Sequence, residues 1–211
     1  MGAKRRTTAA GDLMNKGERT RSRIKEAFAE LLESKSFASI TIADICRASD
    51  VTVGGFYFHF ASQDELLNEV MWQYADDLVR AVDAAIIDGP RASLAASVCT
   101  AFLRMYSAQS GLARTFQQLV RIRSDYTARW RAAREPRIAR LGQILQAGRP
   151  ELKANKARLL AHALVMMIAC KLDLSYPTAK EGSRGNRPAL RTIERDLVLL
   201  WTRMVDGAAP A

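Results

Sequence analysis

The chain has 211 residues, of which 48% are hydrophobic, so it is long enough to bury a sizeable core. Its 32 Lys and Arg residues outnumber its 22 Asp and Glu residues, and the net charge of +10 favours a polyanionic partner, nucleic acid before an anionic membrane. The three cysteines, Cys46, Cys99 and Cys170, lie far apart among apolar residues, a pattern typical of reduced thiols rather than of a disulfide framework.

The first fifteen residues, 1–15, place Lys4, Arg5 and Arg6 among Thr, Ala and Gly, and this composition predicts a disordered basic arm. An amphipathic helix is predicted over residues 16–34, because apolar residues recur there at helical spacing. Basic side chains crowd the first half of this helix, where they oppose the helix dipole. We therefore expect either a bound anion at this end or a surface helix that tolerates an unfavourable order of charges.

The segment from Thr41 to Phe60 predicts two short helices joined by a tight turn. Thr41 begins the first helix as an N-cap, with Asp44 at the capping-box spacing. Asp50 can adopt the left-handed backbone that such a turn needs, and Thr52 caps the second helix.

The second of these helices opens with Val53, Gly54 and Gly55. A glycine inside a helix costs roughly 1 kcal/mol relative to Ala, so folding alone does not favour this pair. A backbone that lies very close to another surface does favour it. That surface is either the major groove of DNA or a neighbouring helix of the same chain. With the preceding long helix, the segment predicts a helix-turn-helix domain over residues 16–61.

A long connector helix is predicted to begin near Ser62, which caps it while Glu65 closes the capping box, and to stop at Gly89-Pro90. One apolar stripe runs along it at helical spacing: Leu66, Leu67, Val70, Met71, Tyr74, Leu78, Val82 and Ile86.

After Pro90 the apolar spacing predicts helices over about 94–110, 112–120, 125–147, 159–174 and 190–204, with no strand signal. Pro136 is expected to kink or split the helix over 125–147, and residues 175–188 have the Gly, Ser and Pro content typical of a mobile loop. The predicted fold class is all-α, with about nine helices in total.

A set of residues in the first part of the chain falls at a family spacing without a gap: Phe37, Thr41, Ile42, Asp44-Ile45, Ala48, Val51-Thr52, Gly54, Phe56-Tyr57, His59-Phe60, Ser62 and Leu66-Leu67. With this set the first seventy residues resemble the TetR family of transcriptional repressors. The order of the later helices is also similar to that family, although the sequence match there is weak.

The resemblance implies that DNA faces the following residues: Arg21 at the basic end of the first long helix, and Thr41, Thr52, Val53, Gly54, Gly55, Tyr57 and His59. Three positions depart from the family's pattern. Asp50 stands where the family usually has Gly, Gln63 stands where it often has Lys, and Val53 stands where it often has a polar or basic residue. We therefore expect apolar contacts with thymine methyls and a share of readout by DNA shape.

The resemblance further implies that residues 62–211 form a helical effector-binding and dimerisation domain. Helices near 155–174 and 189–206 are expected to pair with a second copy of the chain, and their strong apolar character agrees; the alternative is the centre of a monomeric core. The candidate effector-binding residues are Trp72, Phe102, Met105, Tyr106, Phe116 and Trp130, each of which could equally be plain core. Six arginines between 114 and 134 either admit an anionic group or form a solvated basic face.

The function predicted is a dimeric DNA-binding regulator, a repressor that a small apolar or aromatic effector releases from a palindromic operator. The alternative is an architectural or protein-interaction module that binds DNA without a small-molecule switch. We expect neither catalysis nor a metal or cofactor, because the two histidines, His59 and His162, lie in different domains and no phosphate-binding loop is present. Neither a secretory signal nor a membrane span is predicted, so we expect a cytoplasmic protein without a membrane partner.

Overall fold

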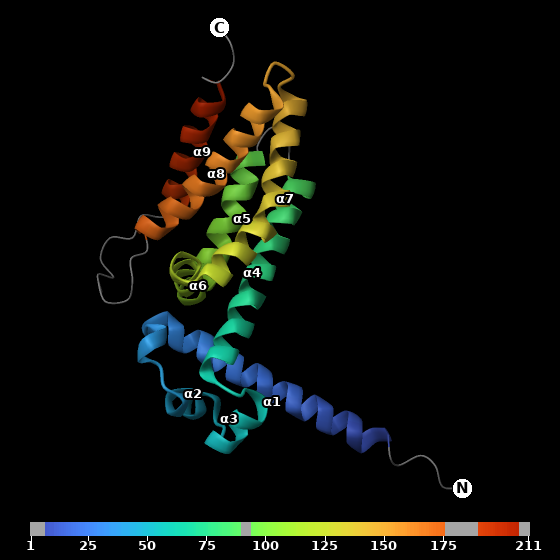
Figure 1. Ribbon diagram of the computed structural model, residues 1–211, viewed down its shortest axis with the longest axis vertical. Coiled ribbons are helices and arrows are strands. Elements are labelled where there is room, and N and C mark those ends of the chain that lie inside the picture. The colour runs from blue at the N-terminus through green and yellow to red at the C-terminus, as the bar shows by residue number, and fades with distance from the viewer. Residues whose placement is uncertain (1–6, 90–93, 176–189, 207–211) are drawn as a thin grey trace. The chain divides into compact units, whose positions relative to one another are not determined.

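The computed structural model describes the backbone of residues 7–89, 94–175 and 190–206, and within these ranges the side chains of 16–89, 94–171 and 192–204. In this part of the chain every regular element is helical, which confirms the predicted all-α class (Figure 1). The elements are α1 (Thr7–Ser34), a 3-10 turn η1 (Phe37–Ser39), α2 (Ile42–Ser49), α3 (Val53–His59), α4 (Gln63–Asp88), α5 (Leu94–Ala108), α6 (Ser110–Ile122), α7 (Ser124–Gly148), α8 (Ala154–Ser175) and α9 (Leu190–Asp206).

The chain divides into two compact units, Met1–Trp72 and Gln73–Ala211, and the division falls inside α4. The first turns of α4 belong to the first unit because side chains bind them there. Gln63 Nε2 donates to the Ile40 carbonyl at 2.9 Å, and Arg21 of α1 binds Glu69. The sequence analysis places its domain boundary at the start of α4, between residues 61 and 62, and that functional boundary stays a prediction.

Helix α1 begins at Thr7, nine residues before the predicted start at Lys16. The backbone of residues 7–15 is therefore helical, and the prediction of a disordered arm is wrong for this segment. Once a helix exists, each added residue gains one hydrogen bond while only one residue is fixed, whereas nucleation fixes three residues for the first bond, and no proline interrupts this segment. The basic residues of the predicted arm, Lys4, Arg5 and Arg6, lie outside the described residues.

The two short helices have the predicted caps. Thr41 Oγ1 accepts from the Asp44 N–H at 3.1 Å while Asp44 Oδ2 accepts from the Thr41 N–H at 3.1 Å, so the capping box is closed in both directions. Thr52 Oγ1 accepts from the Gly55 N–H at 3.0 Å. Between the helices Asp50 has φ 51° and ψ 52°, the left-handed conformation predicted for the turn. Arg23 Nη2 donates to the Ser49 and Asp50 carbonyls at 2.5 and 2.9 Å, so a side chain from α1 holds this turn.

The start of α4 differs in detail from the predicted capping box. Ser62 Oγ accepts from the Glu65 N–H at 3.1 Å, as predicted, but Glu65 Oε2 accepts from the Ala61 N–H at 2.6 Å instead of from Ser62 itself. All eight residues of the predicted apolar stripe of α4 are buried.

In the second unit α7 packs along α8, and α5 lies against α9 (Figure 1). A Cβ added at Gly142 of α7 would lie 3.0 Å from the Arg158 Cα of α8, so this glycine permits the close approach of the two helices. Helix α7 is not split at Pro136. Both Pro136 and Ala132, whose carbonyl loses its helical partner, are exposed, so water can satisfy that carbonyl. The predicted loop falls almost wholly on residues 176–189, outside the described part of the chain.

None of the described helices combines the length and the apolar character that crossing a membrane requires. The cysteines Cys46 and Cys99 are buried and unpaired, while Cys170 is exposed. Burial raises the pKa of Cys99 to about 12, so this thiol stays protonated at neutral pH.

Asp50 is the only described residue other than glycine with positive φ, and it offers a direct test of the turn. We expect Asp50→Gly to leave the free energy of unfolding unchanged or raise it by up to about 1 kcal/mol, and Asp50→Val to lower it by about 1–2 kcal/mol, because a β-branched residue resists the left-handed conformation. Urea unfolding of the three proteins measures the order Gly, Asp, Val. Equal stability of the Asp and Val proteins would contradict the assigned backbone.

Candidate functional site

The exposed face of α2 and α3 carries most of the residues predicted to meet DNA. Thr41, Thr52 and Gly54 are exposed, and the exposed fractions of Val53 and Tyr57 are 51% and 53%. The opposite face of α3 holds the helix in place, because Phe56 is fully buried and its ring lies 5.9 Å from that of Phe60. A seven-residue helix is too short to be stable alone, so this packing and the Thr52 cap maintain it.

The two glycines of α3 have different surroundings. A Cβ added at Gly55 would lie 2.7 Å from Val51 Cγ1 and 3.2 Å from Thr52 Oγ1, so packing within the chain explains that glycine. A Cβ added at Gly54 would meet nothing within 4 Å. Of the two explanations that the sequence allows, close packing inside the chain therefore accounts for Gly55 but not for Gly54, whose close approach to DNA stays a prediction.

The sequence analysis missed Phe58, whose side chain is 82% exposed. Its exposure follows from helical periodicity: Phe56 and Phe60 lie four residues apart on the buried face, so the residue midway between them points away from the core. An exposed aromatic on the same short helix as Tyr57 enlarges the apolar part of this face.

Arg21 has different partners from the predicted DNA backbone. Its Nε donates to Glu69 Oε1 at 3.2 Å, its Nη2 bonds Glu69 Oε2, and its Nη1 bonds the His59 carbonyl at the end of α3. The guanidinium also lies 4.1 Å from the centre of the Phe60 ring. The hydrogen bond from Arg21 lowers the pKa of Glu69, in agreement with an ion pair. In this structure Arg21 therefore fixes α3 to α1 and α4, and its predicted contact with DNA stays a prediction.

The cations that remain at the basic end of α1 are Lys16 and Arg19. Both are exposed, and neither side chain pairs with an acidic side chain within the described residues. By contrast Arg23 binds the turn before α3, and Lys25 Nζ lies 3.2 Å from Glu69 Oε1. Lys16 and Arg19 are thus the α1 cations free to meet a phosphate.

His59, at the C-terminal end of α3, is half-buried. Burial, and then the nearby Arg21 charge, lower the pKa of His59 below its ordinary value. The imidazole is therefore neutral at pH 7, and it could bind a phosphate as an N–H donor but not as a cation.

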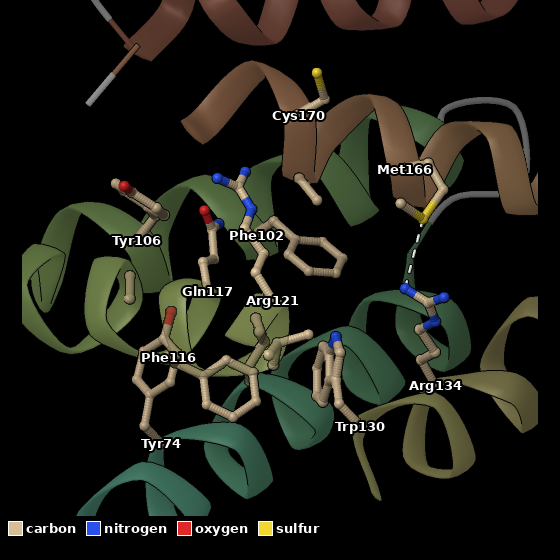
Figure 2. Close-up of a pocket in the computed structure, with 14 residues that line it drawn as sticks. Tyr74, Phe102, Tyr106, Phe116, Gln117, Arg121, Trp130, Arg134, Met166 and Cys170 are labelled. Atoms are coloured by element: carbon tan, nitrogen blue, oxygen red, sulfur yellow. Dashed lines mark hydrogen bonds between the residues drawn. The ribbon is translucent and has the colours of Figure 1, made fainter. Parts of the chain in front are cut away.

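A cavity of about 260 Å³ lies within the second unit (Figure 2). Four of the predicted effector-binding residues line it: Phe102, Tyr106, Phe116 and Trp130. Met105 lines a separate cavity between α4 and α5 instead, and Trp72 belongs to the first unit. The sequence analysis missed the contributions of Tyr74 and Leu78 from α4 and of Met166 from α8, because these residues belong equally to apolar stripes that predict plain core.

Phe116 is the centre of the aromatic lining. Its ring centre lies 5.1 Å from that of Trp130, 5.9 Å from that of Tyr74 and 6.2 Å from that of Tyr126. Burial raises the pKa of Tyr74 far above its ordinary value, so its phenol is neutral. The cavity therefore presents mostly ring faces and edges, with a few polar groups at its wall.

Helices α8 and α9 carry large apolar side chains that the described chain leaves exposed: Leu159, Met166, Leu199, Leu200 and Met204. Their inner faces are buried through residues such as Leu164, Ile168 and Trp201. Within the described residues no group of three or more His, Cys, Asp or Glu side chains is placed to hold a metal ion.

Comparison with known proteins supports the interpretation of the first unit. Residues 24–70 match the model for "Bacterial regulatory proteins, tetR family". The chain is also 29% identical over 107 residues to the HTH-type transcriptional repressor KstR2 of Rhodococcus jostii (strain RHA1), a match that covers 49% of this chain. The chain spans 52% of the length of that relative and 16% of another curated relative that it matches.

Solved structures extend the likeness in fold to both units. A bacterial regulatory protein of the tetR family from Rhodococcus RHA1 has a TM-score of 0.68 at 18% identity, over 91% of this chain and 98% of that one. The regulator FadR from Bacillus subtilis, solved in complex with stearoyl-CoA, has a TM-score of 0.66 at 14% identity, over 85% and 96% of the two chains.

Gly54 allows folding and DNA binding to be separated. Because no atom of the described chain opposes a Cβ there, we expect Gly54→Ala to raise the free energy of unfolding by about 1 kcal/mol. The same methyl should weaken binding to duplex DNA by about tenfold or more, since it holds the helix away from the groove. Urea unfolding and fluorescence anisotropy measure the two effects.

The matched control is Gly148→Ala at the end of α7, where an added Cβ also meets nothing within 4 Å. It should leave DNA affinity unchanged. If Gly54→Ala binds DNA as tightly as the wild type, close approach at this position is not part of the interface.

Arg19 and Arg21 make a second contrasting pair. Arg19→Met should leave stability unchanged and lower the slope of log affinity for DNA against log salt by about 0.9, the loss of one phosphate contact. Arg21→Met should lower the free energy of unfolding by about 1–2 kcal/mol, because Glu69 and the His59 carbonyl lose a half-buried partner. A loss of stability in Arg19→Met together with a lower salt slope in Arg21→Met would show that Arg21, and not Arg19, contacts the phosphate.

Proposed function

The chain belongs to the TetR family of bacterial regulatory proteins, and from this premise we propose that it is a homodimeric transcriptional repressor. In this proposal a small apolar or aromatic effector releases the dimer from a palindromic operator. The observation that carries the proposal is the capped α2–turn–α3 segment, whose outer face exposes Val53, Gly54 and Tyr57 while Phe56 fixes its inner face.

We place α3 in the major groove. Gly54 brings the backbone close to base edges, and Val53 makes apolar contact with a thymine methyl. Tyr57 and Arg19 bind phosphates, which set the register without reading sequence. Because α3 offers few hydrogen-bonding side chains, part of the specificity comes from the shape of the DNA.

The dimer supplies the second recognition helix. Leu159 of α8 and Leu200 of α9 are 66% and 54% exposed, and both lie on the two helices that are expected to pair with a second copy. Burial of such side chains favours association by about 25 cal/mol for each Å² of apolar surface removed from water. A two-fold axis between the copies matches the symmetry of a palindromic operator.

The effector acts through α4, which contributes Tyr74 and Leu78 to the cavity and begins in the first unit. A ligand that packs against these side chains in one position of α4 favours the dimer shape with that position. Release from the operator follows if the favoured shape changes the spacing of the two recognition helices. The stearoyl-CoA complex of FadR, a protein of similar fold, supports a ligand-binding role for the second unit.

Leu200→Glu tests this proposal. The wild-type protein should select palindromic duplexes from a random pool and should sediment as a dimer. The variant should sediment as a monomer, because a carboxylate is too costly to bury in an apolar interface, and should bind the selected palindrome about 100-fold more weakly.

The matched control is Ile87→Glu, since Ile87 is an exposed apolar residue, 76% accessible, on α4. It should remain dimeric and keep its DNA affinity. A Leu200→Glu protein that stays dimeric would refute the assigned interface, and a wild-type protein that selects no duplex would refute the regulator itself.

A further inference from the structure

The wall of the effector cavity carries two positive charges, the guanidinium groups of Arg121 on α6 and Arg134 on α7 (Figure 2). Among the described residues that line it, none is Asp or Glu. Tyr74, another residue of the lining, is neutral, because burial raises its pKa. Of the six arginines between 114 and 134, these are the two that line the cavity, whereas Arg123, for example, pairs with Asp125.

The surroundings of Arg134 are unusual for a guanidinium. Its Nε is buried and has no hydrogen-bond partner in the described part of the chain, and its Nη1 lies 3.5 Å from the Met166 sulfur. Figure 2 shows this contact, with the Trp130 ring on the same side of the cavity. A thioether is a weak acceptor and cannot compensate a partly buried charge. An anion that is not part of the described chain would supply the partner that the buried Nε lacks.

A second buried polar atom without a partner, Gln117 Oε1, also belongs to the lining. In Figure 2 the Gln117 amide lies beside the Arg121 side chain, while the rings of Phe102 and Trp130 lie between these groups and Arg134. The cavity therefore presents polar groups at two places and aromatic rings between them. This pattern suits a ligand with an apolar ring system and polar substituents, and does not suit a plain hydrocarbon.

We infer that the effector is an aromatic organic anion, whose ring system packs against Phe116 and Trp130 and whose carboxylate, or a similar anionic group, pairs with Arg134. A carboxylate can accept from Nε and Nη of one guanidinium together, which satisfies the buried Nε. The size agrees with one or two rings, because a cavity of about 150 Å³ holds benzene and this one measures about 260 Å³. The inference rests on the proposed function, in which this cavity is the effector site, and it narrows the ligand from any apolar compound to an anion.

Titration calorimetry with 2-naphthoate and 2-naphthamide tests the charge directly, because the two molecules share a ring system and nearly the same shape. We expect the wild-type protein to bind the carboxylate more tightly than the amide by about tenfold or more. This comparison needs no variant, so it does not depend on a substituted protein folding.

Arg134→Met then locates the anionic group. It should remove the preference for naphthoate and leave naphthamide binding within about threefold of the wild type, since a methionine keeps the apolar stem of the side chain. The control Arg131→Met changes an exposed arginine of the same helix that is not part of the lining, and should keep the preference.

Equal binding of the two probes, or no binding of either at millimolar concentration, would overturn the inference. A preference that survives in Arg134→Met would also overturn the assignment to this arginine. The affinity of the ligand-free proteins for the selected DNA duplex separates the two proposals. DNA binding by the ligand-free wild type without a charge preference rejects the anionic effector alone, whereas absence of DNA binding by the ligand-free wild type rejects the proposed regulator.

Discussion

The fork of hydrogen bonds from Arg21 is the constraint on which the first unit depends. Helix α3 has seven residues and too few internal bonds to persist without support. Arg21 reaches from α1 to the His59 carbonyl at the end of α3 and to Glu69 on α4, while its guanidinium covers the Phe60 ring. One side chain thus joins three helices at the end of α3 opposite the Thr52 cap. The outer face of α3 can then carry exposed residues that do not stabilise the helix, because its stability comes from elsewhere.

The same division between support and contact separates the two glycines. Gly55 is required by Val51 and Thr52, which close the turn, and so it contributes to the fold. Gly54 is required by nothing in the described chain, and its exposed backbone is the feature that folding least explains. A residue that lowers helix propensity without a packing reason agrees with the proposed contact between DNA and the face that Gly54 forms with Val53 and Tyr57.

In the second unit the comparable feature is Arg134. Aromatic rings in a helical core need no ligand to explain them, since they bury apolar surface whether or not a cavity remains. The Arg134 guanidinium does need an explanation, because its buried Nε has no hydrogen-bond partner within the described chain and its Nη1 lies against a thioether. The polar groups of the cavity wall therefore restrict the chemical class of the effector more than the six predicted effector-binding residues do.

The sequence alone determined the order of the helices, though not the start of α1, and it determined the caps and the turn. The caps and the turn depend on neighbours within four residues: Thr41 with Asp44, Thr52 with Gly55, and Asp50 in the left-handed region. The apolar stripe of α4 was equally predictable, since periodicity decides which face is buried. Only the tertiary structure decided which charges stay free. Arg19 and Arg21 are two residues apart in one basic run. Arg21 and Glu69 are 48 positions apart, so no local sequence pattern predicts the contact between them. For the same reason the sequence could not distinguish Arg134 from the exposed arginines near it. The difference lies in the neighbours that α7 and α8 bring around its guanidinium, and helix packing sets those neighbours.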